Sequence, residues 1–312
     1  MAMNDHEIWV PEEWGGAVLT AVMQNSAIEA LARTEPMGST TKHVPRSGGI
    51  GIDVIAKGGS YSEDDTDDDE VVLTARKLGK AISLADEDIK DAETLINILN
   101  QKKIEWATAY AKGFDNACIG TIGPVYMPSG TAAKRPFVSI REAVRTTDSD
   151  LGYTADTNYL ASAGTVTYDD LSQVLGMYED SGYFSEVDTV VMASPAFKRT
   201  IRDIKDDNER PIFIQGREGT PDTVFGYRVM WTPGARTSTT MTSTPTGNPL
   251  FVVGNRQFII VGRRSGPESF VAGADSGVGF LTDEAKMKMR ARRGFAVGHP
   301  AAVAVLEQSA GS

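Results

Sequence analysis

The chain has 312 residues, of which 41% are hydrophobic and 23% charged, and its formal net charge is −11. Its length allows one large core or two modest ones, and its charge argues against a protein that wraps nucleic acid by neutralising phosphates. The single cysteine, Cys118, excludes an internal disulfide bond. No apolar run approaches the ~18 residues of a membrane span, and the acidic start MAMNDHEIWVPEEW does not resemble a signal peptide.

The first third of the chain predicts elements that cannot support themselves. Residues 11–35 predict a short amphipathic helix with nothing adjacent to pack on. Ile50, Ile52 and Val54 alternate within 42–56, and VVLTARKLGKAISL at 71–84 is a second β-like segment. Together these segments predict a long two-stranded hairpin. An isolated hairpin is marginally stable in water, so we expect support from outside the local sequence.

An acidic run lies at the predicted tip of this hairpin. From Glu63 to Glu70, seven of eight residues are carboxylates. Neighbouring carboxylates ~6 Å apart repel by ~0.7 kcal/mol even in bulk water, so the run needs water, a metal or a cationic partner. The run does not fit a calcium-binding loop that starts at Asp65. Glu70 stands at position 6, where such a loop needs glycine, and Arg76 stands at position 12, where it needs a bidentate glutamate. The sequence therefore favours a solvated or partner-paired loop.

A long helix is predicted over 86–119. Asp86, Glu87 and Asp88 begin it, where the helix dipole favours negative charge. Apolar residues then keep helical spacing to Ile119, and Cys118 lies on this stripe as a core residue.

The second half alternates between helix and strand after a polar, turn-rich stretch at 120–165. We expect a helix near 168–180, a buried strand at 187–193 and a helix that begins at Pro195. Strands are expected in GYRVMW, LFVVGN, QFIIVGRR and AKMKMRARR, followed by a small-residue tail.

Signals of catalysis are absent. His6, His43 and His299 have no ligand spacing, and neither a phosphate-binding loop nor a nucleophile elbow occurs. The glycines of GGIGID do not indicate a dinucleotide-binding loop, because they neither follow a convincing strand nor begin a helix. We therefore predict no catalytic, cofactor-binding or metal-binding residues.

The order of these segments resembles that of the major capsid proteins of tailed bacteriophages. The resemblance rests on VVMASPAFKRTIRDIKDDNERPIF, VFGYRVMWTPG, PLFVVGNRQFIIVGRRSG and MKMRARRGFAVGHPAAVAVL. In that family a motif S-x-E-x-[IL]-x-D precedes the long helix. The stretch from Ser83 to Asp91 matches this motif only in part.

The resemblance implies an α+β fold, the Hong Kong 97-like capsid fold, with a spine helix at 86–119. The implied parts are an N-terminal arm at 1–35, an extended hairpin loop at 36–85, a peripheral domain at 86–165 with a polar insert, an axial domain at 166–255, peripheral-domain strands at 256–298 and a C-terminal tail at 299–312 that returns to the axial domain.

The implied function is structural, not enzymatic: self-assembly into an icosahedral shell of pentamers and hexamers that encloses double-stranded phage DNA. Such a protein works in the virion capsid and assembles in the bacterial host cytoplasm. The partners implied are other copies, a scaffolding protein, a portal protein and a decoration protein, with no membrane and no sequence-specific DNA binding. Because the arm-like pattern begins near Met1, we expect scaffolding by a separate protein. Some members of this family cross-link a hairpin lysine to an asparagine of the peripheral domain. Lys42 and Lys57 lie in the predicted hairpin here, but no asparagine follows Asn255, so we expect no such cross-link.

Two alternatives stay open at this stage. An encapsulin-type compartment shell would have the same fold, and fold alone does not fix function. A monomeric domain that binds metal through the acidic loop is the other; particle size separates it from a shell.

Two surfaces are expected to carry assembly contacts. Lys286, Lys288, Arg290 and Arg292 would share one strand face, and Arg293 brings the segment to five positive charges in eight residues. We expect this segment to meet the acidic tip of an adjacent subunit, formed by Glu63, Asp64, Asp65, Asp67, Asp68, Asp69 and Glu70. The loop RPIFIQGREGTPDT at 210–223 is expected to line the five- and six-fold axes, where Arg210, Pro211, Gly216, Gly219 and Pro221 suit variable conformations.

Overall fold

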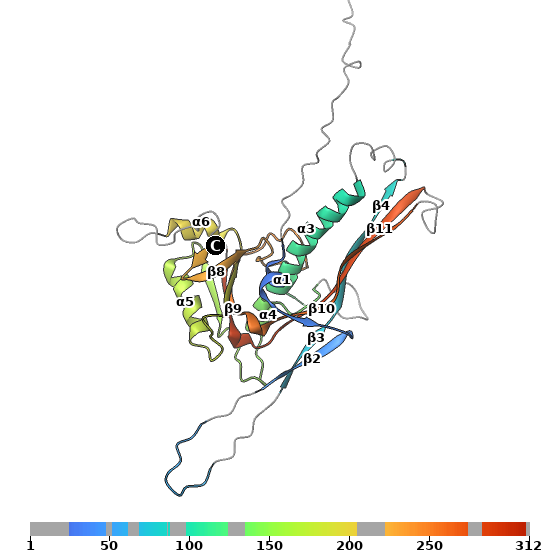
Figure 1. Ribbon diagram of the computed structural model, residues 1–312. Coiled ribbons are helices and arrows are strands. Elements are labelled where there is room, and N and C mark those ends of the chain that lie inside the picture. The colour runs from blue at the N-terminus through green and yellow to red at the C-terminus, as the bar shows by residue number, and fades with distance from the viewer. Residues whose placement is uncertain are drawn as a thin grey trace, which may run out of the picture. The chain divides into compact units, whose positions relative to one another are not determined.

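The computed structural model (Figure 1) describes residues 25–47, 52–61, 69–85, 87, 98–123, 135–204, 222–273 and 283–309. The chain divides into two compact units. The first comprises Met1–Met23, Gly79–Thr108 and Ser269–Met289, and the second comprises Gln24–Leu78, Ala109–Glu268 and Arg290–Ser312.

A six-stranded sheet forms the larger core of the second unit. Its order is β5-β12-β9-β6-β8-β7. The strands are β5 (Tyr159–Ala163), β6 (Thr189–Ala193), β7 (Thr223–Val224), β8 (Tyr227–Trp231), β9 (Leu250–Asn255) and β12 (Val303–Ser309). Every residue of β6 and β9 is buried, as expected for central strands that are covered on both faces.

Two helices cover one face of this sheet, α5 (Tyr168–Glu179) and α6 (Phe197–Asp203) (Figure 1). Thr167 caps α5, because its hydroxyl accepts from the Asp170 amide while the Asp170 carboxylate accepts from the Thr167 amide. Tyr178 and Phe197 bring the helices into the same apolar cluster as Phe251 on β9. The helix expected near 168–180 and the strand in LFVVGN are confirmed. The buried strand expected at 187–193 begins only at Thr189, and the helix expected to begin at Pro195 begins at Phe197.

The C-terminal tail contributes β12, which lies between β5 and β9 in this sheet. β12 pairs antiparallel with β9 and parallel with β5. Between β5 and the end of α3 lies the short helix α4 (Ile140–Val144), which contacts β12. The stretch 120–165, which had no clear pattern in the sequence, thus supplies one edge strand and one helix of the core.

A second sheet of four strands has the order β1-β10-β11-β4. The strands are β1 (Arg33–Pro36), β4 (Arg76–Ala85), β10 (Ile259–Ala272) and β11 (Glu284–Val297). β1 pairs parallel with β10, with Arg33 opposite Ile260. The helix expected over 11–35 is therefore wrong at 33–35, where edge pairing to β10 replaces helical structure. Only α1 (Ala27–Leu31) is helical among the described residues of that segment.

The hairpin is present and shorter than expected. β2 (Thr41–Arg46) pairs antiparallel with β3 (Asp69–Thr74), and its apolar side packs Val44, Val71 and Leu73 with Met37 and Ile260. Residues 52–60 form no strand, and Ile52 and Val54 are fully exposed, so the strand expected there is wrong. Alternation alone cannot hold a strand that has neither a partner strand nor an apolar surface to cover.

The long helix α3 (Ile98–Ile119) ends where the apolar spacing predicted. Phe114 and Cys118 are completely buried, and Tyr110 stacks on Phe114 with ring centroids 5.8 Å apart. The expected start at Asp86–Asp88 lies outside the described residues, except that residue 87 is helical.

Candidate assembly surfaces

The acidic run contributes two residues to the hairpin ladder itself. Asp69 accepts a hydrogen bond from Arg46, opposite it in the ladder, and His43 Nδ1 lies 2.7 Å from Glu70 Oε1. Hydrogen bonds from the Glu70 amide and the Arg46 side chain lower the pKa of Asp69. These two carboxylates therefore already have partners in the same chain. Glu63, Asp64, Asp65, Asp67 and Asp68 lie outside the described residues.

No metal centre occurs in the described part of the chain, where no three His, Cys, Asp or Glu side chains gather in a suitable cluster. Nor is any helix there long and apolar enough to span a membrane.

The basic segment of β11 alternates as its sequence predicts. Met287, Met289 and Ala291 are buried, whereas Lys288 is exposed and Lys286, Arg290 and Arg292 are half-buried. Lys288 Nζ lies over the Phe270 ring, 5.4 Å from its centroid, and Arg290 Nε lies 3.2 Å from Glu268 Oε2. The basic row thus consists of Lys286, Lys288, Arg290 and Arg292.

Arg293 is not part of this row, which corrects the expectation from its sequence. Its side chain is 2% exposed, and its Nε donates to Glu29 Oε1 at 2.6 Å. The side chain points to the buried face because residues 292 and 293 occupy opposite faces of one strand. Arg293 therefore holds α1 within the second unit instead of facing a neighbour.

A buried carboxylate also holds the beginning of α1. Asp115 on α3 accepts hydrogen bonds from the Ser26 and Thr232 hydroxyls and from the amides of Ala27 and Ile28. Burial raises the pKa of Asp115, and these hydrogen bonds oppose that rise. This group therefore holds the start of α1 against α3.

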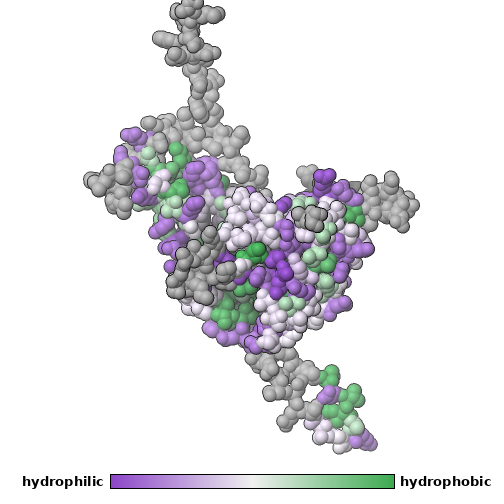
Figure 2. All heavy atoms as spheres, turned by 180° about the vertical axis from the view of Figure 1, so that it is seen from behind, coloured by the Kyte–Doolittle hydropathy of each residue, from purple (hydrophilic) through white to green (hydrophobic). Residues whose placement is uncertain are grey.

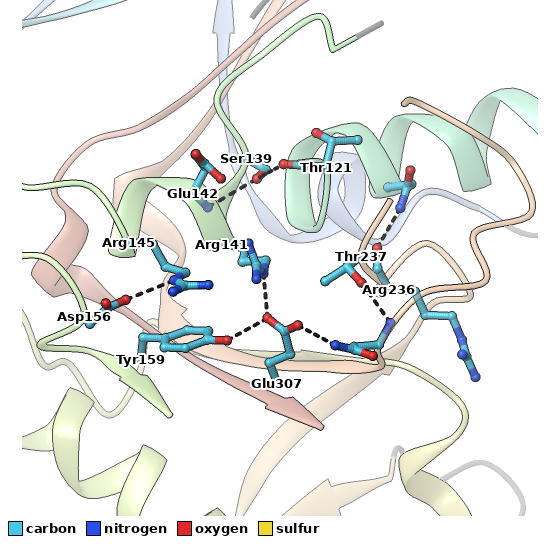
Figure 3. Close-up of polar contacts among 12 residues, drawn as sticks. Thr121, Ser139, Arg141, Glu142, Arg145, Asp156, Tyr159, Arg236, Thr237 and Glu307 are labelled. Atoms are coloured by element: carbon cyan, nitrogen blue, oxygen red, sulfur yellow. Dashed lines mark hydrogen bonds and ion pairs between the residues drawn. The ribbon is translucent and has the colours of Figure 1, made fainter. Parts of the chain in front are cut away.

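Glu307 forms a second buried network, shown in Figure 3. Arg141 Nε and Tyr159 OH donate to Glu307 Oε2 at 2.6 and 2.7 Å, and Asn248 Nδ2 donates to Oε1 at 2.7 Å. Burial alone would raise the pKa of Glu307, but these hydrogen bonds outweigh it and lower the pKa. The network ties α4, β5 and β12 together. Its sequence signal is the glutamate within the otherwise apolar strand VAVLEQ.

A cavity of about 260 Å³ lies at the root of the hairpin. Val44 and Arg46 of β2 and Val71 of β3 form one wall, and Phe258 and Ile260 form another. No local sequence pattern indicates this cavity, because its walls come from distant parts of the chain.

A segment beyond the hairpin ladder exposes apolar side chains. Ile52, Val54 and Tyr61 are 98%, 104% and 84% exposed. Figure 2 shows the segment 52–61 at the bottom, with several hydrophobic residues in green. Clusters of exposed apolar side chains are typical of interaction surfaces.

The expected axial loop falls largely outside the described residues. This applies to Arg210, Pro211, Gly216, Gly219 and Pro221. Asp222 is described, and it accepts a hydrogen bond from Trp231 Nε1 at 2.7 Å.

A sequence model of the phage capsid family matches residues 7–308. The chain belongs to the phage capsid family. No curated protein matches it. Among solved structures, this capsid protein is similar to a chain of Mycobacterium phage Bobi, with a TM-score of 0.71, 16% identity and 97% of each chain covered.

Two further structures agree. Gordonia phage Cozz gives a TM-score of 0.70 at 15% identity over 96% of this chain and 92% of that one. The capsid of an empty GTA particle gives 0.66 at 12% identity over 99% of this chain and 100% of that one. This capsid protein thus has the Hong Kong 97-like fold expected from its sequence.

Proposed function

We propose that this chain is the major capsid protein of a tailed phage, which assembles into an icosahedral shell of pentamers and hexamers around double-stranded DNA. The observation that carries the proposal is the match to the capsid family over residues 7–308, nearly the whole chain. It favours a phage capsid over a compartment shell or a metal-binding domain. The net charge of −11 suits a container that does not hold its duplex by phosphate contacts.

The proposal includes a structural role without catalysis, assembly in the bacterial cytoplasm, and partners beyond other copies. A scaffolding protein, a portal protein and a decoration protein are the partners that a phage shell of this kind would use. The division into arm, extended loop, peripheral domain, axial domain and returning tail belongs to the same proposal.

The test is the size of the purified full-length chain. Expression with its scaffolding partner should give closed particles of megadaltons in negative-stain images. A stable species near 33.5 kDa under all assembly conditions would reject the proposal. Neighbouring portal and terminase genes would support a phage shell, and a cargo-enzyme gene would support an encapsulin.

Within the shell, the acidic tip is proposed to contact the basic row of an adjacent subunit, chiefly through Asp65, Asp67 and Asp68. Exposed ion pairs contribute only ~0–1 kcal/mol each and act within a Debye length of ~8 Å, so this contact would be weak and reversible. Lys286 and Lys288 are the residues to test, because Arg290 already pairs with Glu268.

Changing Lys286 and Lys288 to Glu should impair assembly, and adding Asp67→Lys and Asp68→Lys should partly restore it. Lys103→Glu on the exposed side of α3 is the control and should have little effect. A charge reversal that restores nothing would mean that the carboxylates are solvated.

The loop 210–223 is proposed to line the five- and six-fold axes. A map of the assembled shell that places Pro211 and Gly216 at the outer edge of a capsomer would reject this placement.

A further inference from the structure

The cavity at the hairpin root has the size of one large side chain. Its volume of about 260 Å³ is below the roughly 300–1,000 Å³ of pockets that take drug-sized ligands. Pockets of side-chain size at protein interfaces commonly take an aromatic anchor that supplies much of the binding energy. The cavity therefore fits a single protruding side chain better than a free small molecule.

The lining is apolar with a cationic border. Val44, Val71, Phe258 and Ile260 supply the apolar walls. Among the lining residues that the structure describes, only the arginines at 33 and 46 are charged. Each guanidinium already has one carboxylate partner outside the lining, Glu35 for Arg33 and Asp69 for Arg46.

One hydrogen-bonding group of this border is unused. The Nε of Arg46 is buried and has no hydrogen-bond partner in the described part of the chain. An occupant that carries an aromatic ring followed by carboxylates would match both the apolar walls and the two arginines.

The same chain offers such a segment in SYSEDD, residues 60–65. Tyr61 is 84% exposed, so its ring is not covered by its own chain. Glu63 and Asp64 follow it after a single serine, Ser62. A tyrosine contributes most to binding when its ring is buried and its hydroxyl stays near polar groups. At this cavity those groups would be Arg46 and Gln257.

We propose that Tyr61 of one subunit inserts into the hairpin-root cavity of an adjacent copy, with Glu63 and Asp64 facing Arg33 and Arg46. The proposal deepens the shell function and rests on it, because it names the receptor for the exposed segment 52–61. Asp65, Asp67 and Asp68 are left for other partners.

This contact joins two different surfaces, since the anchor lies beyond the hairpin ladder and the receptor lies at its root. A contact between unlike surfaces repeats from copy to copy and closes into a ring when the rotation fits. Each subunit in a pentamer or hexamer would then give one tyrosine and receive one. Loss of an anchor side chain typically costs ≥2 kcal/mol, so we expect Tyr61→Ala to raise the critical concentration for assembly more than about tenfold.

Engineered cysteines test the contact directly. Chains carrying Tyr61→Cys and chains carrying Gln257→Cys are mixed, assembled and oxidised mildly. Gln257 is an exposed lining residue, and the native Cys118 is completely buried, so it will not compete. A covalent dimer at twice 33.5 kDa on a non-reducing denaturing gel is the expected result.

The matched control pairs Tyr61→Cys with Val187→Cys, which is 87% exposed elsewhere in the second unit. Equal cross-linking of the control pair, or none with Gln257→Cys in well-formed particles, overturns the docking proposal. If no particles form even from the unmodified chain with its scaffolding partner, the proposed function fails instead. Gln257→Trp, which places a bulky ring at the lining of the cavity, should weaken assembly as Tyr61→Ala does, and combining the two should add little.

Discussion

Arg293 and Glu29 lie 264 positions apart in the sequence, and their side chains form an ion pair at 2.6 Å. Glu29 Oε1 also accepts a hydrogen bond from Tyr110 OH at 3.0 Å. The pair thus connects α1, α3 and β11 within the second unit. A buried guanidinium is tolerated only where a carboxylate and carbonyl oxygens satisfy it, and Arg293 also donates to the Ser265 carbonyl.

Removing the charge of Glu29 should destabilise the fold strongly. In Glu29→Gln, Arg293 becomes an uncompensated buried charge, which costs about 3–5 kcal/mol. Urea unfolding should therefore show a much lower midpoint, whereas Arg292→Gln on the half-buried face should leave it nearly unchanged. Replacing both partners, as Glu29→Gln with Arg293→Met, should recover most of the loss. A double variant as unstable as Glu29→Gln alone would contradict this explanation.

The Glu307 network predicts a pH-dependent effect of one substitution. Because the pKa of Glu307 is lowered in the folded state, its contribution to stability is present above the unfolded pKa of about 4.3 and is lost as pH falls through the folded value. Glu307→Gln should cost about 3 kcal/mol at pH 7, since it leaves Arg141 buried without its partner. The difference from the unmodified protein should shrink below pH 4. Glu186→Gln, at an exposed position, serves as the control.

His299 predicts an acid-sensitive component of stability. Burial, and next the charge of Arg46, lower the pKa of His299 from 6.5 to about 4. The unfolded chain therefore binds the proton first, and stability that is complete above pH 6.5 falls as pH decreases toward 4. The loss should reach about 3 kcal/mol, at 1.36 kcal/mol per pKa unit.

In His299→Asn this slope should disappear, because asparagine keeps an acceptor for the Ala301 amide but does not titrate. Urea unfolding between pH 4 and 7 measures it. An equal slope in both proteins would exclude His299 as the source.

Two glycines should respond in opposite directions to alanine. A Cβ at Gly120 would lie 2.2 Å from the Arg236 carbonyl oxygen, a backbone atom that cannot move aside cheaply, so Gly120→Ala should cost about 3 kcal/mol or more. Gly176 lies inside α5 with open space around it, and Gly176→Ala should stabilise by about 0.5–1 kcal/mol. Thermal unfolding of the two variants under one condition tests both signs at once.

Mature particles should contain no covalent cross-links between subunits. No asparagine occurs between residues 256 and 312, and the Lys42 ammonium lies 2.7 Å from Glu35 Oε2 and donates to the Pro36 carbonyl. A denaturing gel should therefore show one band at 33.5 kDa. A ladder of multimers would reject this prediction.

Several elements could be predicted because neighbouring residues are enough to specify them. Thr167 and Asp170, which lie within four positions of each other, cap α5. The apolar run of β6 predicts a buried strand even when its partner strands are unknown. The end of α3 at Ile119 and the alternation along β11 follow from the helical and strand periods. The order of these elements was also enough to indicate the capsid family.

Other features depend on partners far away in the chain. Alternation predicted a strand through Ile52 and Val54, yet both are fully exposed because no strand pairs with them there. The amphipathic pattern over 11–35 predicts a helix, but residues 33–35 form a strand because they pair with the edge of β10.

The site features belong to this second class. Arg293 can be buried because Glu29 pairs with it, and Glu307 can be buried because Arg141 donates to it. The cavity forms mainly between segments from the first quarter and the last fifth of the chain. Local pattern sets backbone periodicity because that energy arises between near neighbours in the sequence. Which face is buried, which charge is paired and where a hollow remains come from packing between distant segments, and the tertiary structure alone brings those segments together.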